Sequence, residues 1–206
     1  MSQHLHEIDS FLDDANYVRE VALRQKYSSC NFLELKSLYP GYRTSNIDLK
    51  IKEEIRSKLE KVYNTKFKLL QCFFTYVTHE SMLGVPHVDP ISDVSGLIYL
   101  NPNYTSDSGT TIFDETDEES SKRHIPEYRS KIEILYNTTI KPSNSIKRNI
   151  AREMVELKKK FPILKTFNNS FNRGVFYPAK YLHSANNYFG DKIEDSRLTL
   201  NVFGSF

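Results

Sequence analysis

The feature of this sequence that most constrains its fold is a change in texture after Thr65. From Phe67 to Val77 the chain is rich in aromatic and β-branched residues, which favour strands. Similar short runs recur toward the C-terminus, and polar turn residues such as Asn101-Pro102-Asn103 separate them. Further strands are expected at 85–89, 95–100, 110–113, 173–177, 180–183 and 197–203. Many short strands joined by polar turns are typical of a β-sandwich or jelly roll.

The N-terminal part of the chain has a helical pattern instead. Apolar residues at helical spacing predict one amphipathic helix over 9–26, with Asp9 or Ser10 as its N-cap, and a second over 45–64. Lys and Glu fill one face of the second helix, and the opposite face is apolar, formed by Ile51, Ile55, Leu59 and Val62. We expect residues 1–65 to support a β core and to have no catalytic role.

A polar segment interrupts the β pattern between its two halves. It begins with an acidic run at 114–119 and continues with a basic run at 141–165, in which apolar residues keep helical spacing. We therefore expect a single domain with a helical insertion at 114–170, between core segments at 66–113 and 171–206. A basic helix face is most often simply solvated, and a contact surface for a substrate or partner is the second interpretation.

Length and composition limit the class of protein. A chain of 206 residues is the size of one domain and can bury a core without a disulfide or a structural metal. We expect Cys30 and Cys72 to be reduced thiols. The sequence shows neither a long apolar run nor a secretory signal, which predicts a cytoplasmic protein without a membrane partner. The formal net charge of +2 does not favour a nucleic-acid partner.

The triplet His87-Val88-Asp89 is the first candidate for chemistry. In an extended chain, residues i and i+2 face the same way, so both side chains can reach one metal ion. Pro90 follows and favours extended or turn geometry at Asp89. The triplet alone is a weak signal, because many chains of this composition contain one by chance. A structural His–Asp pair is the alternative interpretation.

A second histidine strengthens this pattern. His183 ends a strand-like run that begins at Gly174. Two imidazoles and one carboxylate form the facial triad of non-haem Fe(II) oxygenases, which leaves coordination positions open for other ligands. The sequence therefore offers His87, Asp89 and His183 as candidate metal ligands.

The last predicted strand carries a candidate anion site. Arg197 and Thr199 lie on one face of an alternating run, and Leu198, Leu200 and Val202 lie on the other. A buried arginine needs an anionic partner, and its planar guanidinium suits a carboxylate. The hydroxyl of Thr199 is placed to donate a second hydrogen bond to the same carboxylate. A structural salt bridge of Arg197 is the alternative.

Together these residues resemble the signature of the Fe(II)/2-oxoglutarate-dependent dioxygenase superfamily, and of its prolyl-hydroxylase-like members in particular. The runs at 95–101, 108–113 and 173–177 resemble strands that flank the motifs in that group. The run at 8–12 resembles its supporting N-terminal helix. The segment at 114–166 has no counterpart in the resemblance, so the substrate is left open.

The resemblance implies a mostly β fold with supporting helices, in which a double-stranded β-helix (jelly roll) carries a metal site at one mouth. It implies that His87, Asp89 and His183 hold Fe(II), with 2-oxoglutarate and O2 as cosubstrates. The implied reaction couples oxidative decarboxylation of 2-oxoglutarate to hydroxylation of a protein side chain or a small amino-acid-like substrate. No catalytic residue beyond the metal ligands is implied.

The resemblance also implies which residues bind 2-oxoglutarate. Its distal carboxylate would meet Arg197, helped by Thr199. Tyr76, on the strand before the His-x-Asp triplet, and Tyr99, on the strand after it, match places where such proteins carry a tyrosine hydroxyl near 2-oxoglutarate.

Three other functions compete with the oxygenase. Two histidines, one aspartate and a water also describe a catalytic zinc site, so a zinc hydrolase is possible, although hydrolysis needs no buried clamp for a dicarboxylate. A non-catalytic jelly-roll module that binds a metal or another ligand would have no need for the complete set of ligands and Arg197. The third is nucleic-acid demethylation within the same superfamily. The near-neutral net charge does not favour it, but the basic helix at 141–165 keeps it open.

Overall fold

The structure is a computed structural model that describes residues 4–29, 41–80, 84–89, 91–105, 107–115, 125–136 and 143–206. Its helices are α1 (Ala15–Leu23), α3 (Leu49–Tyr63), α4 (Ile125–Tyr136) and α5 (Asn144–Lys158). Its strands are β1 (His6–Ile8), β2 (Ser28–Ser29), β3 (Tyr42–Arg43), β4 (Leu69–Val77), β5 (Val94–Tyr99), β6 (Thr110–Phe113), β7 (Ile163–Phe167), β8 (Gly174–Pro178), β9 (His183–Ala185) and β10 (Arg197–Ser205).

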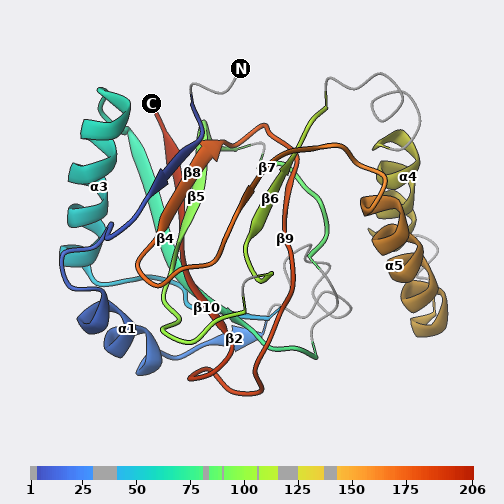
Figure 1. Cartoon of the computed structure of the whole chain (residues 1–206), viewed down its shortest axis with the longest axis horizontal. Coiled ribbons are helices and arrows are strands. Elements are labelled where there is room, and N and C mark those ends of the chain that lie inside the picture. Colours follow the sequence, from blue (N-terminus) through green and yellow to red (C-terminus); the bar gives the residue numbers. More distant parts are fainter. Residues whose placement is uncertain are drawn as a thin grey trace.

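The strands form two antiparallel sheets that face each other. The larger sheet has the order β1-β8-β5-β10-β4-β3-β2, and the smaller has the order β7-β6-β9. Helices α1 and α3 lie on the outer side of the larger sheet, and α4 and α5 lie beyond the smaller one (Figure 1). The expected fold, a mostly β jelly roll with N-terminal helices and a helical insertion, is confirmed.

The alternation predicted for the C-terminal strand is present in β10, where successive side chains lie on opposite faces of the larger sheet. Leu198, Leu200 and Val202 are fully buried against the N-terminal helices. Arg197 and Thr199, which alternate with them along β10, face the interior between the two sheets. Because β10 pairs with β4 along its whole length and with β5 over most of it, both faces are set by one register.

The N-terminal helices differ from the prediction in where they begin. Helix α1 starts after Asp14, whose carboxylate accepts a hydrogen bond from the Tyr17 N–H, so Asp9 and Ser10 are not its N-cap. Helix α3 starts after Asp48 in the same way. Residues 6–8 form β1 beside β8, so the run at 8–12 precedes the helix rather than forming it.

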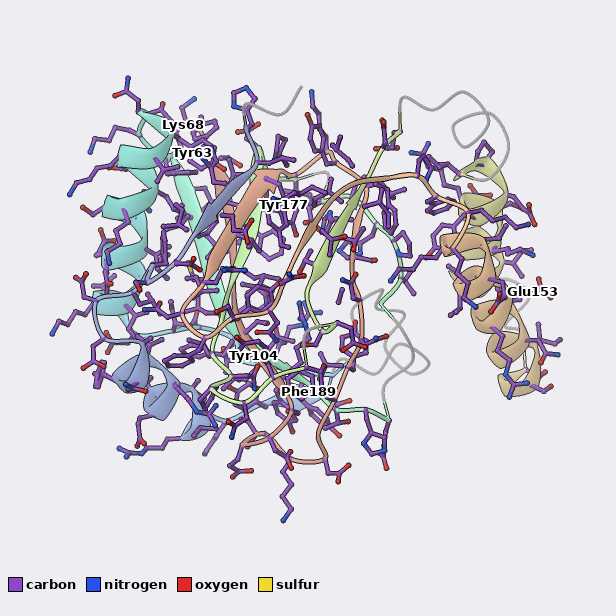
Figure 2. All side chains as sticks on the ribbon, viewed as in Figure 1. Tyr63, Lys68, Tyr104, Glu153, Tyr177 and Phe189 are labelled. Carbon is purple, nitrogen blue, oxygen red and sulfur yellow. The ribbon has the colours of Figure 1, made fainter. Side chains whose placement is uncertain are left out.

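The insertion contains a strand that the sequence did not reveal. The insertion is helical as expected: α5 covers the run with helical spacing, and a second helix, α4, precedes it. Glu153 on α5 (Figure 2) forms an ion pair of 2.5 Å with Lys131 on α4, which links the two helices. However, β7 pairs with β6 in the smaller sheet, so the chain rejoins the core at Ile163 and not after 170. Four of the five residues of β7 are exposed, which removes the alternation that would have predicted a strand.

Two other expectations concern single features. Residues 85–89 are not a regular strand: only His87 pairs, in an isolated antiparallel bridge with His183. Cys72 is a buried free thiol whose pKa burial raises to about 12, and Cys30 lies outside the described residues. None of the helices in the described part of the chain is both long and apolar enough to cross a membrane.

Candidate metal centre and cosubstrate cavity

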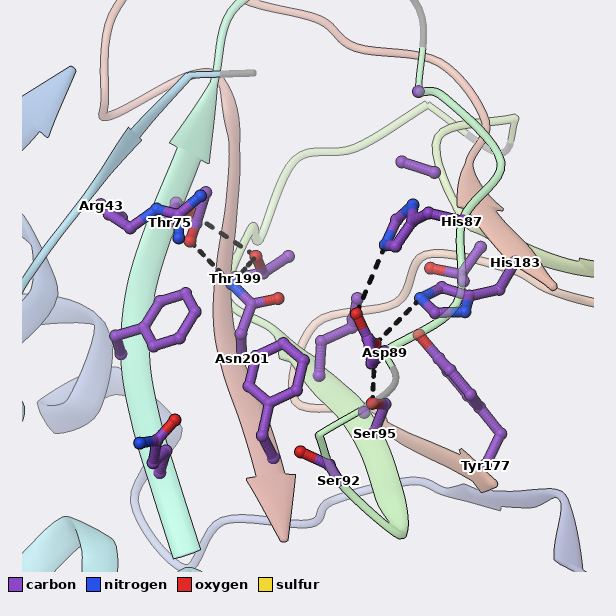
Figure 3. Close-up of a pocket in the computed structure, with 18 of the residues that line it drawn as sticks. Arg43, Thr75, His87, Asp89, Ser92, Ser95, Tyr177, His183, Thr199 and Asn201 are labelled. Carbon is purple, nitrogen blue, oxygen red and sulfur yellow. Dashed lines mark hydrogen bonds and ion pairs between the residues drawn. The ribbon is translucent and has the colours of Figure 1, made fainter. Parts of the chain in front are cut away.

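The three predicted metal ligands lie together between the two sheets. His87 and Asp89 come from the segment before β5, and His183 begins β9. The backbones of His87 and His183 exchange two hydrogen bonds of 2.9 Å, which fixes the two histidines side by side. One ligand atom from each of His87, Asp89 and His183 lies within 4.8 Å of the others. Figure 3 shows the three side chains converging.

The hydrogen bonds of the two imidazoles suit metal binding. Nδ1 of His87 lies 2.7 Å from the Val85 carbonyl oxygen, and Nδ1 of His183 lies 2.8 Å from the Tyr181 carbonyl oxygen. A carbonyl only accepts, so each Nδ1 carries the proton and each Nε2 keeps its lone pair. The two Nε2 atoms face the Asp89 carboxylate, at 3.8 Å for His87 and 3.4 Å for His183.

Electrostatics also favours neutral imidazole at this site. Burial and, to a smaller extent, the neighbouring His183 lower the pKa of His87 to about 4. Metal ions compete with protons for imidazole nitrogen, so a histidine that is already neutral binds a cation without first losing a proton. The Asp89 carboxylate is buried and accepts a hydrogen bond of 2.7 Å from the Ser95 hydroxyl, which holds its orientation.

The triad opens into a cavity of about 440 Å³. This volume is typical of a small-molecule site. The same cavity is lined by Arg197 and Thr199, the two residues predicted to bind the distal carboxylate. Both lie on β10, across the cavity from His183 on β9. The metal-ligand cluster and the predicted carboxylate clamp therefore share one chamber.

Arg197 is buried with few polar partners. Its side chain is 5% exposed. Nε donates to the Ser108 carbonyl oxygen at 3.1 Å, and Nη2 donates to the Thr110 hydroxyl at 3.3 Å. No carboxylate in the described part of the chain forms an ion pair with it. Its hydrogen-bond acceptors among the described residues are neutral, and this arrangement suits an anionic ligand, because an unpaired charge in the interior is costly.

A known protein family and several solved structures resemble this chain. A model described as "Family of unknown function (DUF6445)" matches residues 1–204. The chain belongs to the DUF6445 family. A search of curated proteins finds no match.

Solved structures share the fold of this DUF6445 member. A prolyl-4-hydroxylase from Pseudomonas putida matches with a TM-score of 0.56 and 11% identity, over 100% of this chain and 95% of the other. HygX from Streptomyces hygroscopicus, with nickel and 2-oxoglutarate bound, matches with a TM-score of 0.59 and 12% identity, over 98% and 83%. A prolyl hydroxylase from Trichoplax adhaerens, in complex with a peptide fragment, matches with a TM-score of 0.58 and 11% identity, over 99% and 84%. The resemblance to 2-oxoglutarate/Fe(II) oxygenases is thus confirmed for the fold.

The two predicted tyrosines of the DUF6445 chain take different places. Tyr99 is fully buried beside Arg197: its ring centroid lies 5.5 Å from the Arg197 guanidinium carbon, and its hydroxyl lies 2.8 Å from the Thr110 hydroxyl. Tyr76 lies on the opposite face of β4, where its ring stacks on Tyr42 at 4.7 Å. The expected position of Tyr76 near the cosubstrate is therefore wrong, because the residues of β4 that face the cavity are its neighbours.

Other tyrosines reach the cavity instead. Tyr177 on β8 lies with its ring 4.7 Å from the His183 ring, and its hydroxyl points toward the triad (Figure 3). Tyr188, from the loop after β9, also lines the cavity. Burial raises the pKa of Tyr188 to about 12, and nearby Arg197 opposes that rise. The pairing of β8 brings Tyr177 to the cavity, and the path of the loop after β9 brings Tyr188, so no local motif in the sequence could have identified them.

A lysine from the insertion is a third residue that the sequence did not reveal. Nζ of Lys158, at the end of α5, donates to the Gly84 carbonyl at 3.2 Å and to the Ala185 carbonyl at 2.8 Å. A Cβ atom at Gly84 would lie 2.5 Å from the Ala185 oxygen, so only glycine allows this close approach. Lys158 thus joins the segment that leads to His87 and the strand that starts with His183.

Proposed function

We propose that this chain is an Fe(II)- and 2-oxoglutarate-dependent oxygenase that hydroxylates a protein side chain or a small amino-acid-like substrate. The observation that carries the proposal is a single cavity that holds a two-histidine, one-carboxylate cluster together with a buried arginine. The oxygenases that share the fold include prolyl hydroxylases and HygX, and HygX has been solved with hygromycin B bound.

The ligand set fits Fe(II). His87, Asp89 and His183 would bind one face of the ion, and the other positions would stay open for 2-oxoglutarate and O2. Bound Fe(II) would supply the redox centre for oxidative decarboxylation of 2-oxoglutarate to succinate and CO2, coupled to substrate hydroxylation. The protein supplies the neutral Nε2 atoms, and Ser95 holds the Asp89 carboxylate. No further catalytic residue is proposed.

Arg197 would bind the distal carboxylate of 2-oxoglutarate. Its guanidinium is already oriented by Ser108 and Thr110, so little side-chain entropy is lost on binding. Thr199 lines the same wall and can donate a hydroxyl hydrogen bond, and Tyr188 lies close enough for its pKa to respond to Arg197. The Tyr99 ring would pack against the Arg197 guanidinium and hold its position.

The rival functions make less use of this cavity. A zinc hydrolase could use the same three ligands, yet it would have no role for a buried arginine opposite them. A non-catalytic module would bind metal or 2-oxoglutarate without producing succinate. Our proposal also includes a cytoplasmic location and no nucleic-acid partner.

The test is calorimetric titration of 2-oxoglutarate into the anaerobic Fe(II)-loaded protein, followed by measurement of succinate in air. Wild type should bind 2-oxoglutarate and release succinate slowly without a substrate. Arg197→Ala should keep its metal and lose roughly 2–5 kcal/mol of binding free energy for 2-oxoglutarate, about 30- to several-thousand-fold in affinity. Arg197→Lys should restore only part of it, because an ammonium lacks the planar fork.

Arg24→Ala is the matched control, since Arg24 is an exposed arginine at the C-cap of α1 that pairs with Glu20 and does not line the cavity. It should bind 2-oxoglutarate as wild type does. A wild-type protein that takes up metal but shows no affinity for 2-oxoglutarate would exclude the oxygenase and favour the hydrolase or the binding module.

A further inference from the structure

The cavity extends well beyond the triad and Arg197. Along β4 every second residue from Leu69 to Val77 lines it, which corresponds to about 26 Å of strand. On β10 the lining continues from Arg197 and Thr199 to Asn201 and Phe203. A small dicarboxylate between the metal site and Arg197 would leave the remaining part of this surface for the primary substrate.

An aromatic platform forms the floor of that remaining part. The rings of Phe73 on β4 and Phe203 on β10 are stacked, with centroids 5.6 Å apart and planes 18° from parallel. Both rings are only partly buried. Leu69 and Ile91, which line the same cavity, are 50% and 89% exposed. A ligand with an apolar group would cover this surface, and the removal of apolar area from water would favour binding.

A cation stands at one side of the platform. The guanidinium carbon of Arg43, on β3, lies 5.4 Å from the centroid of the Phe73 ring. Next to it, Nδ2 of Asn201 donates to the Thr75 hydroxyl at 2.7 Å, which forms a polar border across the sheet. In Figure 3, Arg43 and Thr75 lie across the cavity from His87 and Asp89.

The charges of the cavity wall favour an anionic substrate. Apart from the histidines, the charged side chains among its described lining residues are Arg43, Arg197 and Asp89. In the proposed function Asp89 serves the metal and Arg197 serves 2-oxoglutarate, so Arg43 is the cationic side chain of the described lining to which that function gives no role. A guanidinium has five N–H donors, so Arg43 can keep its contacts within the protein while it binds a carboxylate.

We infer that the primary substrate is a small carboxylate with an apolar, preferably planar, group: the carboxylate pairs with Arg43 and the apolar group lies on Phe73 and Phe203. This inference rests on the proposed function, because that function assigns the rest of the cavity to metal and cosubstrate. The pairing would place the apolar group between Arg43 and the triad. Arg43 is thus a specificity-determining residue of the substrate site.

The experiment uses two probes that differ only in charge: N-acetyl-L-phenylalanine and its primary amide. Each is titrated by calorimetry into full-length protein loaded with Mn(II) and 2-oxoglutarate. The acid should bind at least tenfold more tightly than the amide. In Arg43→Gln that preference should disappear while the affinity for 2-oxoglutarate stays at the wild-type value. In Phe203→Ala both probes should lose affinity by a similar factor.

Several results would overturn the inference. Equal affinities of the acid and the amide for wild type would show that no cation of the protein binds the carboxylate. This comparison needs the wild-type protein alone. If Arg43→Gln kept the preference for the acid, a cation other than Arg43 would bind the carboxylate. If Arg43→Gln lost tenfold in affinity for 2-oxoglutarate, Arg43 would serve the cosubstrate instead. Failure of wild type to bind 2-oxoglutarate would instead contradict the proposed function. The acid-to-amide ratio could then still be measured on the protein loaded with Mn(II) alone.

Discussion

The helices on the two sides of the β core stabilise different parts of the site. On one side, α1 and α3 bury a large apolar cluster against the larger sheet, which includes the fully buried Phe74 and Leu200. On the other, α4 and α5 form a smaller cluster that reaches Val85, Val88 and Leu182. These last three residues lie within two positions of the predicted metal ligands in sequence.

The difference indicates a division of roles. The N-terminal helices hold the face of β10 opposite Arg197 and Thr199, so they support the carboxylate clamp through the main core. The insertion holds the irregular segment before His87 and the short strand that starts with His183. Short or irregular segments have few ladder hydrogen bonds of their own, so outside packing must fix their position.

The largest expected effect comes from the main core. Phe74→Ala should lower the free energy of unfolding by about 3–5 kcal/mol, because it opens a cavity beneath a fully buried ring. Chemical denaturation measures the loss.

Leu157→Ala, the matched substitution in the smaller cluster, should destabilise mainly its own region. Hydrogen exchange should then show faster opening around α4 and α5 while the amides of β10 keep their protection. Loss of protection in β10 would show that the two regions unfold as one.

Removal of a metal ligand should affect metal binding without loss of stability, since neither apolar cluster contains His87 or His183. His87→Ala and His183→Ala should each lower metal affinity by more than about 100-fold, because loss of a ligand exceeds the 10–100-fold effect of outer contacts. Circular dichroism should remain that of wild type. Metal analysis after equilibrium dialysis against Mn(II) is the measurement, with the exposed His79→Ala as control. Unchanged metal uptake in both ligand variants would contradict the assignment.

The smallest effect tests the link between the insertion and the metal site. Burial, together with nearby Arg197, lowers the pKa of Lys158 to about 8, so its charge is held in the interior at a cost to stability. Lys158→Met should therefore leave the free energy of unfolding unchanged or raise it. It should still weaken Mn(II) binding by about tenfold, because the Gly84 and Ala185 carbonyls lose their shared donor.

Lys159→Met is the control for that variant. Lys159 is exposed and pairs with Glu156, so its loss should change neither quantity. Lys158→Arg should recover part of the metal affinity, since a guanidinium can also donate to two carbonyls. Wild-type metal affinity in Lys158→Met would show that the insertion does not position the ligands.

Local patterns in the sequence were enough to predict part of the fold and of the candidate site. The spacing of His87 and Asp89, and the alternation from Arg197 to Val202, identified the candidate ligands and the face of the last strand, because extended backbone dictates which side chains share a side. The apolar stripe of α3 was equally readable: Ile51, Ile55 and Leu59 are buried as expected.

Features that depend on strand pairing and on contacts between distant segments could not be predicted from those patterns. In β4 both faces carry apolar or aromatic residues, because both are covered, so the sequence did not show that Tyr76 faces the helices and Thr75 the cavity. Lys158 stands in a run of three lysines that reads as solvated, and Arg43 lies on a strand of two residues. The packing of α5 against β9 and the register of β3 on β4 bring them to the site, and both arise between segments that no local pattern connects.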